Sequence, residues 1–251
     1  GLSPYILREL SDVIIPYLVF IFNYAISSCT FPLHFLEAVV FFLFKKGDRS
    51  VPGNYRSIVI ENPFLKVLST TLTTRITNYA EQNELFPQWQ FAFRKNRSTF
   101  GAASLLHEMI KVRLNSKKRT FVCFIDFSKC FDTIRRDILY TKLQILGFPF
   151  ELCKLLHYIF SNITFIIKSG TMLTEKFTTF IGLPQGDPLS PVLFSLFTYD
   201  LPACLPHLGP ILHGIGIPYI MYADDLAIIA ESPEELQAAI NALVLYCNVN
   251  G

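Results

Sequence analysis

The sequence predicts an α+β fold, and three observations support this class. Apolar runs rich in β-branched residues alternate irregularly with segments of helical spacing, and the clearest neighbouring strands are joined as a hairpin rather than through a helix. Hydrophobic residues make up 51% and charged residues 17% of the chain, which excludes a disordered protein. A length of 251 residues permits one large domain or two small ones.

The N-terminal segment 5–28 is mostly apolar and predicts a helix in which Pro16 is a start or a kink. Residues 13–33 carry no charge for 21 residues, which is long enough to cross a bilayer. Prolines and several Asn, Ser and Thr side chains interrupt this stretch, so a buried helix followed by a turn explains it better. We therefore expect no membrane contact. The chain opens on Gly1 without a signal-peptide pattern, so we expect a piece of a longer protein.

The next elements are a strand and two helices. Residues 38–44 form a short apolar run that predicts a strand. Apolar side chains recur at helical spacing over 62–84 and predict a helix. Ser98 or Thr99 is expected to cap a further helix that continues to about residue 115.

The middle of the chain repeats this mixture. Residues 121–125 are apolar and partly β-branched, as in a buried strand. Helical patterns follow over 136–146 and 150–160, with glycine and proline between them. The remaining predicted segments are two strands and a helix, over 164–168, 177–181 and 190–201.

The last elements are a hairpin and a helix. Two apolar runs, 219–222 and 226–230, flank Ala223-Asp224-Asp225 and predict a hairpin with carboxylates at its turn. Ser232-Pro233-Glu234-Glu235 is a capping box with proline at the first helical position, which predicts a final helix.

Charge is divided unevenly along the chain. Residues 1–176 contain all 22 Lys and Arg and have a net charge of +9. The charged residues of 177–251 are all Asp or Glu, and this portion has a net charge of −7. The six cysteines are scattered without a C-x-x-C pair, so we expect neither a zinc module nor a disulfide framework, and an intracellular location fits.

Acidic residues are the first candidates for chemistry. Asp224 and Asp225 lie beside apolar strands, which is costly unless a cation compensates; a solvent-facing turn is the simpler explanation of the pair alone. Asp126, at the end of a predicted strand, could reach that turn, and two or three such carboxylates could hold a pair of Mg²⁺ ions for phosphoryl transfer. Asp132 is better explained as a cap for the helix 135–146.

A glycine- and proline-rich loop, GLPQGDPLSP at 182–191, completes the pattern. Its glycines allow a ligand to approach the backbone, and Gln185 could offer its amide to a base, sugar or phosphate. Alone, such a loop would be an ordinary connector.

Together these segments resemble a known family. IDFSKCFD, GLPQGDPLSP and YADD, in this order, resemble the core palm motifs of reverse transcriptases, and KKGDRSVPGNYRSI and QWQFAFRKNRST resemble fingers motifs of non-LTR (LINE-type) retrotransposon enzymes. The resemblance covers nearly the whole chain. It implies a right-hand polymerase fold, with an N-terminal extension and fingers in 1–120 and a palm in 121–251 whose antiparallel sheet is flanked by helices. It also implies that the chain stops before the thumb and excludes the endonuclease domain common in this family.

The resemblance assigns roles to individual residues. Asp126 and Asp224 match the principal metal ligands, with the carbonyl of Phe127 assisting and Asp225 as the supporting acid. Two Mg²⁺ ions are the expected cofactors, with Mn²⁺ as a substitute. Phe131 matches the steric gate that rejects a ribose 2′-hydroxyl; in isolation it would be a core aromatic residue.

Further residues match positions that contact the substrates. Those of the nucleotide pocket are Lys46, Arg56, Gln185 and Gly186. Those of the template segment are Phe93, Arg94, Arg97 and Ser98, at the start of a run with eight basic residues and one acid up to Arg119. Surface cations of this kind are usually only solvated.

The sequence departs from the family at three positions. Ser57 replaces a usual proline, and Ala92 and Asn96 replace usual glycines. Asn tolerates a positive φ angle, so Asn96 is a mild change, whereas Ala92 could constrict the approach of the template.

The resemblance implies an RNA-directed DNA polymerase of a retrotransposon, with an RNA template, a DNA primer, dNTPs and the element's own RNA as partners in a ribonucleoprotein. Such a particle is expected in the nucleus and cytoplasm. The alternatives are a reverse transcriptase of the group II intron maturase or telomerase type, and an inert RNA-binding remnant. A viral RNA-dependent RNA polymerase fits less well because of Phe131.

Overall fold

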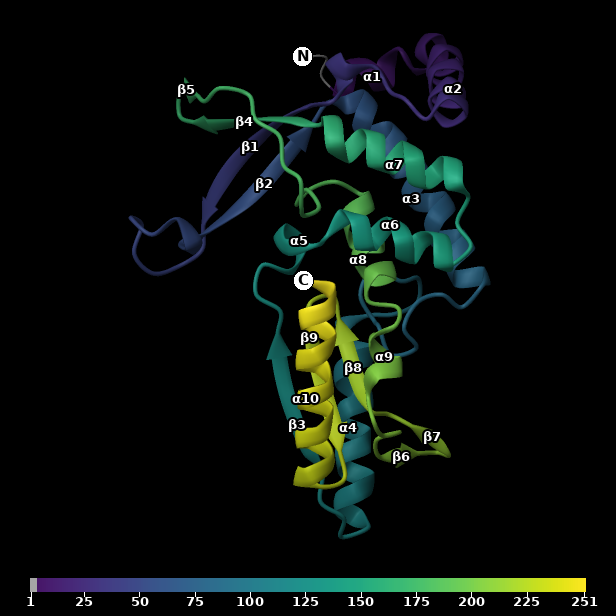
Figure 1. Ribbon diagram of the computed structural model, residues 1–251, viewed down its shortest axis with the longest axis vertical. Coiled ribbons are helices and arrows are strands. Elements are labelled where there is room, and N and C mark those ends of the chain that lie inside the picture. Colours follow the sequence, from purple (N-terminus) through teal and green to yellow (C-terminus); the bar gives the residue numbers. More distant parts are fainter. Residues whose placement is uncertain (1–3) are drawn as a thin grey trace. The chain divides into compact units, whose positions relative to one another are not determined.

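The chain folds into two compact units in the computed structural model, which describes residues 4–251 (Figure 1). Unit 1 consists of Gly1–Thr77, from residue 4 on, and Arg136–Ser190; unit 2 consists of Asn78–Arg135 and Pro191–Gly251. Each unit therefore takes residues from both sides of position 120. The division into fingers and palm at that position remains a prediction about function.

The first helices belong to unit 1. The predicted N-terminal helix is two helices, α1 (Pro4–Glu9) and α2 (Ser11–Ser28), and Pro16 lies inside α2. By length and composition alone α2 could cross a membrane, and only 6% of its apolar window is buried.

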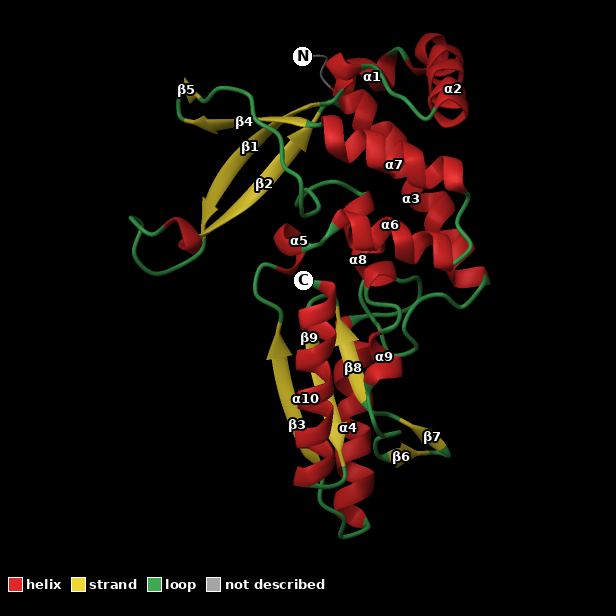
Figure 2. Ribbon diagram, in the orientation of Figure 1, coloured by secondary structure: helices red, strands yellow, loops and turns green. Residues whose placement is uncertain are grey.

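Unit 1 contains a mixed sheet, which extends to one side of its helices in Figure 2. It contains β1 (Glu37–Phe44), β2 (Tyr55–Glu61), β4 (Thr164–Ser169) and β5 (Met172–Leu173) in the order β2-β1-β4-β5, and β1 and β4 run parallel. The strands predicted over 38–44 and 164–168 are confirmed. The strand predicted over 177–181 is wrong: Phe177 makes one isolated bridge to Phe165, and no strand continues from it.

The other helices of unit 1 agree with the sequence pattern. Helix α3 (Pro63–Gln82) buries Leu65, Leu68, Leu72 and Ile76, which recur at helical spacing, and it continues past Thr77 into unit 2. The remaining described helices of this unit are the 3₁₀ turns η1 (Leu33–Phe35) and η2 (Pro52–Asn54), and α6 (Arg136–Ile145) and α7 (Phe150–Asn162).

An antiparallel sheet organises unit 2. Strand β9 (Asp225–Ala230) lies between β3 (Phe121–Asp126) and β8 (Tyr219–Tyr222). The predicted hairpin is thereby confirmed as β8 and β9. A small ribbon, β6 (Ile211–Leu212) and β7 (Ile215–Gly216), completes the strands described in this unit.

Helices cover both faces of this sheet. Ala102 and Met109 of α4 (Thr99–Asn115) pack with Ile220 and Ile229 of the sheet. Ala239 and Leu243 of α10 (Pro233–Asn250) pack with the alternate strand residues, such as Met221 and Ile228. Because neighbouring strand residues point to opposite faces, the two helices lie on opposite sides of the sheet.

Three shorter helices complete the description: α5 (Cys130–Thr133), α8 (Leu189–Phe197) and α9 (Leu201–Cys204). The helix predicted over 190–201 therefore ends early. The predicted capping role of Asp132 is also wrong, because Asp132 lies within α5 while α6 begins only at Arg136.

Both serine caps are confirmed. The Ser98 hydroxyl accepts a hydrogen bond from the Gly101 amide at 3.1 Å, and the Ser232 hydroxyl accepts one from the Glu235 amide at 3.1 Å. These bonds satisfy amides that the helix itself leaves without partners.

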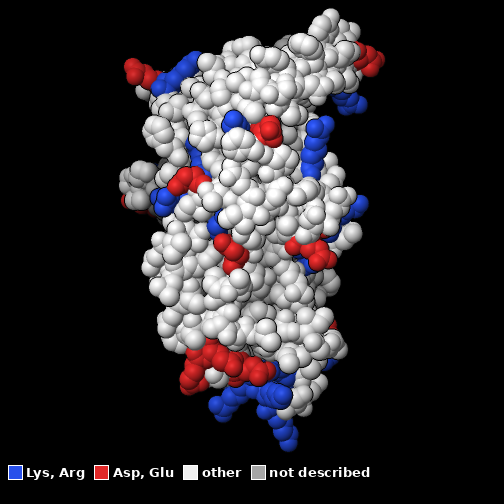
Figure 3. All heavy atoms as spheres, turned by 45° about the vertical axis from the view of Figure 1, so that its right-hand side comes forward, with Lys and Arg blue, Asp and Glu red and all other residues white. Residues whose placement is uncertain are grey.

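Charges are sparse on the face shown in Figure 3, where most atoms belong to uncharged residues and acidic and basic groups lie side by side at the lower end. In unit 2 such a pair joins Arg113, which is buried, to Glu231. The +9 and −7 portions of the chain are therefore not separated into opposite faces at this point.

Candidate active site

Asp126 and Asp225 are directly opposite each other on neighbouring strands. Asp126 is the last residue of β3 and Asp225 is the first of β9, and they are antiparallel partners in the register. Directly opposed residues point to the same face, with their Cβ atoms typically about 5 Å apart. Both residues are exposed. The fold thus brings together two carboxylates that are far apart in the sequence.

Asp224 lies in the two-residue turn beside this pair. Tyr222 pairs with Asp225, so Ala223 and Asp224 form the loop of the hairpin. Ala223 has a φ of 56° whereas Asp224 is not among the residues with positive φ, which is the pattern of a type II′ turn. Glycine is the usual residue at the first position, so Ala223 costs of the order of 1 kcal/mol there.

The three aspartates and the carbonyl of Phe127 are all hard oxygen donors, the ligands that Mg²⁺ prefers. Within residues 4–251, no group of three or more His, Cys, Asp or Glu side chains is placed to hold a metal ion on its own. Mg²⁺ is commonly bound through one or two carboxylates together with substrate phosphates and water, rather than in a cage made entirely by the protein. An exposed pair such as Asp126 and Asp225 fits that mode of binding.

Cys130 lies beside the aspartates, and the sequence motifs did not predict a role for it. It is buried, and its pKa is raised to about 12 by that burial and by the neighbouring carboxylate of Asp224. The thiol therefore stays protonated at neutral pH and can act as a donor to Asp224. Only the spacing of Cys130 from Asp126 could have indicated this contact.

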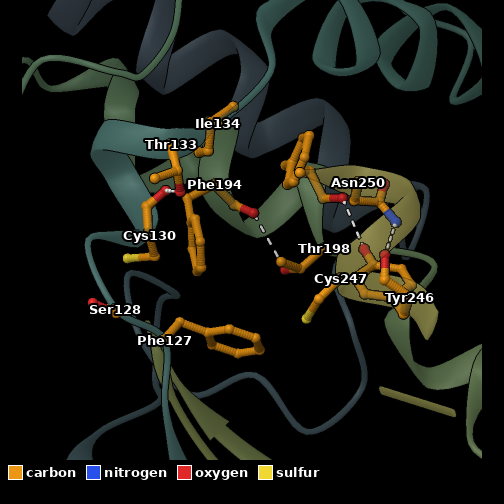
Figure 4. Close-up of a pocket in the computed structure, with 12 residues that line it drawn as sticks. Phe127, Ser128, Cys130, Thr133, Ile134, Phe194, Thr198, Tyr246, Cys247 and Asn250 are labelled. Carbon is orange, nitrogen blue, oxygen red and sulfur yellow. Dashed lines mark hydrogen bonds between the residues drawn. The ribbon is translucent and has the colours of Figure 1, made fainter. Parts of the chain in front are cut away.

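A small apolar cavity of about 180 Å³ lies next to β3, and its lining includes Phe127, which directly follows Asp126 (Figure 4). Phe127 and Phe194 project their rings into it, and α10 contributes Tyr246 and Cys247 to its wall. Phe131 lies in α5 and is partly buried. Its ring centroid is 5.0 Å from that of Phe194. Packing against Phe194 restricts the orientation of the Phe131 ring.

A larger groove, of about 430 Å³, lies on the α4 side of the sheet. Its walls are mostly apolar and come from α4, β3, β8 and β9, and its polar groups include Asp126, Tyr222 and Asp225. Its volume is in the range of small-molecule sites. An apolar groove that ends at two carboxylates could hold an organic substrate against a bound cation.

The glycine-rich loop at 182–191 is fixed to β2 within unit 1. The Val59 amide donates to the Gln185 carbonyl at 2.8 Å. Gly186 has a φ of 125°, and a Cβ atom there would lie 2.4 Å from the Val59 carbonyl oxygen. Glycine is thus required at this position both by the backbone angle and by the close approach of β2.

Arg136 holds the entrance to this loop, and sequence reasoning missed it. Its buried guanidinium donates to the carbonyls of Phe160, Thr179 and Gly182 at 2.6–2.8 Å. A cation surrounded by backbone carbonyls has no sequence signature, because its partners do not depend on side-chain type.

A buried pair of carboxyl groups lies under the same loop. Glu61, at the end of β2, and Asp187 are 5% and 3% exposed. Burial raises the pKa of Glu61 to about 9, and the negative charge of Asp187 acts in the same direction. Burial also raises the pKa of Asp187. Glu61 is therefore protonated at neutral pH.

The predicted triphosphate contacts are exposed and belong to unit 1. Arg56 is on β2 opposite Leu43, and Lys46 is in the loop that joins β1 to β2. The aspartates belong to unit 2. The structure therefore shows the two cations on one hairpin, and their role at the nucleotide remains a prediction.

The predicted template residues have different surroundings. Phe93 is 53% exposed with a φ of 59°, and Arg97 donates to the Gln88 carbonyl at 2.8 Å. Arg94 is bound by both oxygens of Glu81, at 2.8 and 2.7 Å, which leaves it few donors for a phosphate. Ser98 caps α4, as expected. Asn96 has a φ of 61°, which confirms that it occupies a position suited to glycine.

Residues 44–251 match the profile of a family described as reverse transcriptase (RNA-dependent DNA polymerase). The chain is 29% identical over 231 residues to the RNA-directed DNA polymerase from mobile element jockey of Drosophila funebris, in an alignment that covers 90% of this chain and 24% of that protein. It is 28% identical over 211 residues to the retrovirus-related Pol polyprotein from type-1 retrotransposable element R2 of Popillia japonica, covering 82% and 29%. The chain thus spans about a quarter of the length of these relatives.

The fold is similar to that of solved telomerases. Apo telomerase from Candida tropicalis aligns with 95% of this chain and 45% of its own at a TM-score of 0.58 and 11% identity. A form truncated from the C-terminal domain aligns with 84% and 47%, also at a TM-score of 0.58 and with 12% identity. At these identities the likeness concerns the fold alone.

Proposed function

The chain belongs to the reverse transcriptase (RNA-dependent DNA polymerase) family, and we propose from this that it transfers deoxynucleotides from dNTPs to a primer 3′-hydroxyl under the direction of an RNA template. The observation that supports this most strongly is the register pair Asp126–Asp225, with Asp224 in the adjoining turn. This register supports the proposal because it brings two carboxylates together at the end of the sheet, beside the turn that contains Asp224.

Asp126, Asp224 and Asp225, with the carbonyl of Phe127, would hold two Mg²⁺ ions or Mn²⁺ in their place. When bound, such ions lower the pKa of the attacking hydroxyl and stabilise the leaving pyrophosphate. The chain's own contribution is to place the carboxylates on rigid elements: β3 and β9 fix Asp126 and Asp225 by main-chain pairing, and Asp224 is held by its turn.

Phe131 is proposed to select deoxynucleotides. Its ring is kept in place by Phe194, at a centroid distance of 5.0 Å. A ring fixed in this way would clash with a ribose 2′-hydroxyl and would leave that hydroxyl without hydrogen-bond partners. The preference for dNTPs would follow from this contact.

The remaining substrate contacts are proposed from the family. Gln185, Gly186, Lys46 and Arg56 would contact the incoming nucleotide, where positive charge neutralises the triphosphate. Phe93 and Arg97 would contact the template strand by stacking and by charge. Because templating is by base pairing, protein contacts to the RNA should be independent of sequence.

The biological setting is proposed from the relatives, whose names place them in mobile elements. The chain would act in a non-LTR retrotransposon protein that is bound to the element's own RNA, in the nucleus and cytoplasm. Thumb and endonuclease domains would belong to the same longer protein.

Primer extension on an RNA template tests the proposal. With Mg²⁺ present we expect complementary dNTPs to be added, and we expect removal of Mg²⁺ by EDTA to stop the reaction reversibly. Asp224→Asn should abolish extension, whereas Asp12→Asn, an exposed acid on α2, should not change it. Absence of extension by the unaltered chain, or an equal rate in Asp224→Asn, would contradict the proposal.

A further inference from the structure

Gln90 is a fully buried polar residue next to the carboxylate turn. Its exposed fraction is 0%, and it lies in the irregular segment between α3 and α4. A buried side-chain amide is stable only when its donors and acceptor have partners. The hydrogen-bond partners of the Gln90 side chain therefore show which part of the structure it stabilises.

The main chain around Gln90 is fixed to β8. The Met221 amide donates to the Trp89 carbonyl at 2.9 Å, and the Phe91 amide donates to the Met221 carbonyl at 2.9 Å. Gln90 and Met221 thus form a parallel bridge. This bridge places the side chain of Gln90 beside the residues that follow Met221.

The side chain of Gln90 binds the backbone of Ala223 on both sides. The Ala223 amide donates to Gln90 Oε1 at 3.0 Å, and Gln90 Nε2 donates to the Ala223 carbonyl at 3.3 Å. Oε1 also accepts from the Ala92 amide at 3.0 Å. The two peptide groups that flank Ala223 are therefore both oriented by one amide.

Ala223 needs such support because of its conformation. It is the non-glycine residue with positive φ in the turn, and it directly precedes Asp224. The peptide group that contains its carbonyl also contains the amide of Asp224, so its orientation sets the direction in which Asp224 leaves the turn. An amide that accepts from one peptide group and donates to the next can hold both orientations at once.

We propose that Gln90 is a positioning residue of the active site, which holds Ala223 in its left-handed conformation and thereby directs Asp224 and Asp225. This inference rests on the proposed function. Gln90 also links the turn to the segment 93–98, because Oε1 accepts from Ala92 immediately before Phe93. Both the template segment and the turn belong to unit 2.

The test uses Gln90→Met, which keeps the length of the side chain and removes all three hydrogen bonds. Gln90→Glu is the second variant, because a carboxylate can still accept from Ala223 but can no longer donate to its carbonyl. The control is Gln237→Met on α10, whose exposed amide donates to Asn241. Each variant is made in the 251-residue chain.

Residue-resolved amide hydrogen exchange gives a readout that does not need activity. We expect the Ala223 amide to exchange at least tenfold faster in Gln90→Met than in the unaltered chain, while amides of α10 and of the centre of β9 keep their protection. An unchanged rate at Ala223 would overturn the proposal. A uniform rise across the sheet would also overturn it, since that would show a general structural role.

Steady-state primer extension gives the second readout. We expect kcat to fall at least tenfold in Gln90→Met with less than a threefold change in KM for dNTP, and Gln90→Glu to be intermediate. If the unaltered chain extends primers and Gln90→Met matches it, the proposal for Gln90 fails while the proposed function stands. If the unaltered chain does not extend primers, the proposed function fails, and hydrogen exchange alone decides whether Gln90 holds the turn.

Discussion

Glu61 and Asp187 show how burial alters single residues beneath the nucleotide loop. The pKa of Glu61 is raised to about 9 by burial and by the charge of Asp187, whereas the unfolded chain has a Glu pKa near 4.5. Between these values the folded state binds one proton more than the unfolded state. The contribution of Glu61 to the free energy of unfolding should therefore be fully present below about pH 4.5 and fall as the pH rises towards 9, by up to about 1.4 kcal/mol per pH unit.

Glu61→Gln removes this titration while it keeps the size of the side chain. We expect the free energy of unfolding, measured by urea titration between pH 6 and 9, to decline less steeply in Glu61→Gln than in the unaltered chain. The variant should also be the more stable of the two at the alkaline end. Parallel declines in both proteins would show that Glu61 is not protonated in the folded state.

Phe131 is the residue on which sugar selection depends in this account. Phe131→Ala removes the ring that is placed against Phe194, and we expect incorporation of rNTP relative to dNTP to rise at least tenfold. Phe20→Ala, an equally large change at an exposed position of α2, should leave the ratio unchanged. Competitive incorporation of rNTP and dNTP on one RNA template measures the ratio for both variants. An unchanged ratio in Phe131→Ala would show that Phe131 does not select against ribonucleotides.

At the residue scale, the sequence predicted the acidic residues but not the residues that contact the aspartate turn and the glycine-rich loop. Asp126, Asp224 and Asp225 are recognisable because carboxylates next to apolar strands are unusual. Gln90, Cys130 and Arg136 were not predicted, because Gln90 and Arg136 act mainly through backbone groups and Cys130 through one spatial contact with Asp224. Arg94 shows the converse, since its charge suggested a template contact while its guanidinium binds Glu81.

Ser98, the capping residue that precedes helix α4, has two suggested roles, one as a cap and one as a template contact. Ser98→Ala should lower the free energy of unfolding by about 1 kcal/mol, because the Gly101 amide loses its partner. Ser98→Asp should retain the cap and weaken RNA binding by adding a negative charge. Thermal unfolding and RNA titration measure the two effects.

Ser232→Ala at the start of α10 provides the matched comparison. It removes the same kind of bond, to the Glu235 amide, and should cost a similar free energy without any effect on RNA affinity. Equal RNA affinities for Ser98→Asp and the unaltered chain would show that Ser98 is a cap only.

The loop at 182–191 depends on one glycine where it meets β2. Gly186→Ala would place a Cβ atom 2.4 Å from the Val59 carbonyl oxygen at a φ of 125°, so we expect a loss of more than about 2 kcal/mol in stability. Gly170→Ala, at a φ of 60° with no atom within 4 Å, should cost about 1 kcal/mol. Equal losses in the two variants, measured by urea unfolding, would contradict the close approach.

The elements themselves were largely predictable where periodicity was strong. Helices α3, α4, α6 and α7 and the β8–β9 hairpin follow apolar spacing and capping residues. Strand β2 was not predicted, because its polar residues interrupt the apolar run, and its place is set by pairing with β1. The strand expected over 177–181 failed for the opposite reason: its residues are apolar, but only Phe177 finds a partner.

At the scale of the whole molecule, the chain crosses three times between units, after Thr77, Arg135 and Ser190, and no local pattern predicts this. Residues 136–190 return to unit 1 after β3 has entered unit 2, so the acids of one motif and the glycine-rich loop of the next belong to different units. The uneven distribution of charge along the sequence can be related to the elements that each portion contains. The acidic final portion contains β8, β9 and the aspartate turn, and under the proposed function a Lys or Arg there would compete with a bound metal ion for the carboxylates.

Asp126 and its partners across the hairpin are proposed to carry out RNA-templated DNA synthesis. Single-turnover addition of one complementary dNTP to a primer on an RNA template tests it most directly. We expect the unaltered chain to add that nucleotide and Asp126→Asn to be slower by at least about 100-fold, because a metal ligand is lost. Equal rates for the two proteins, or addition that ignores the template base, would contradict the account.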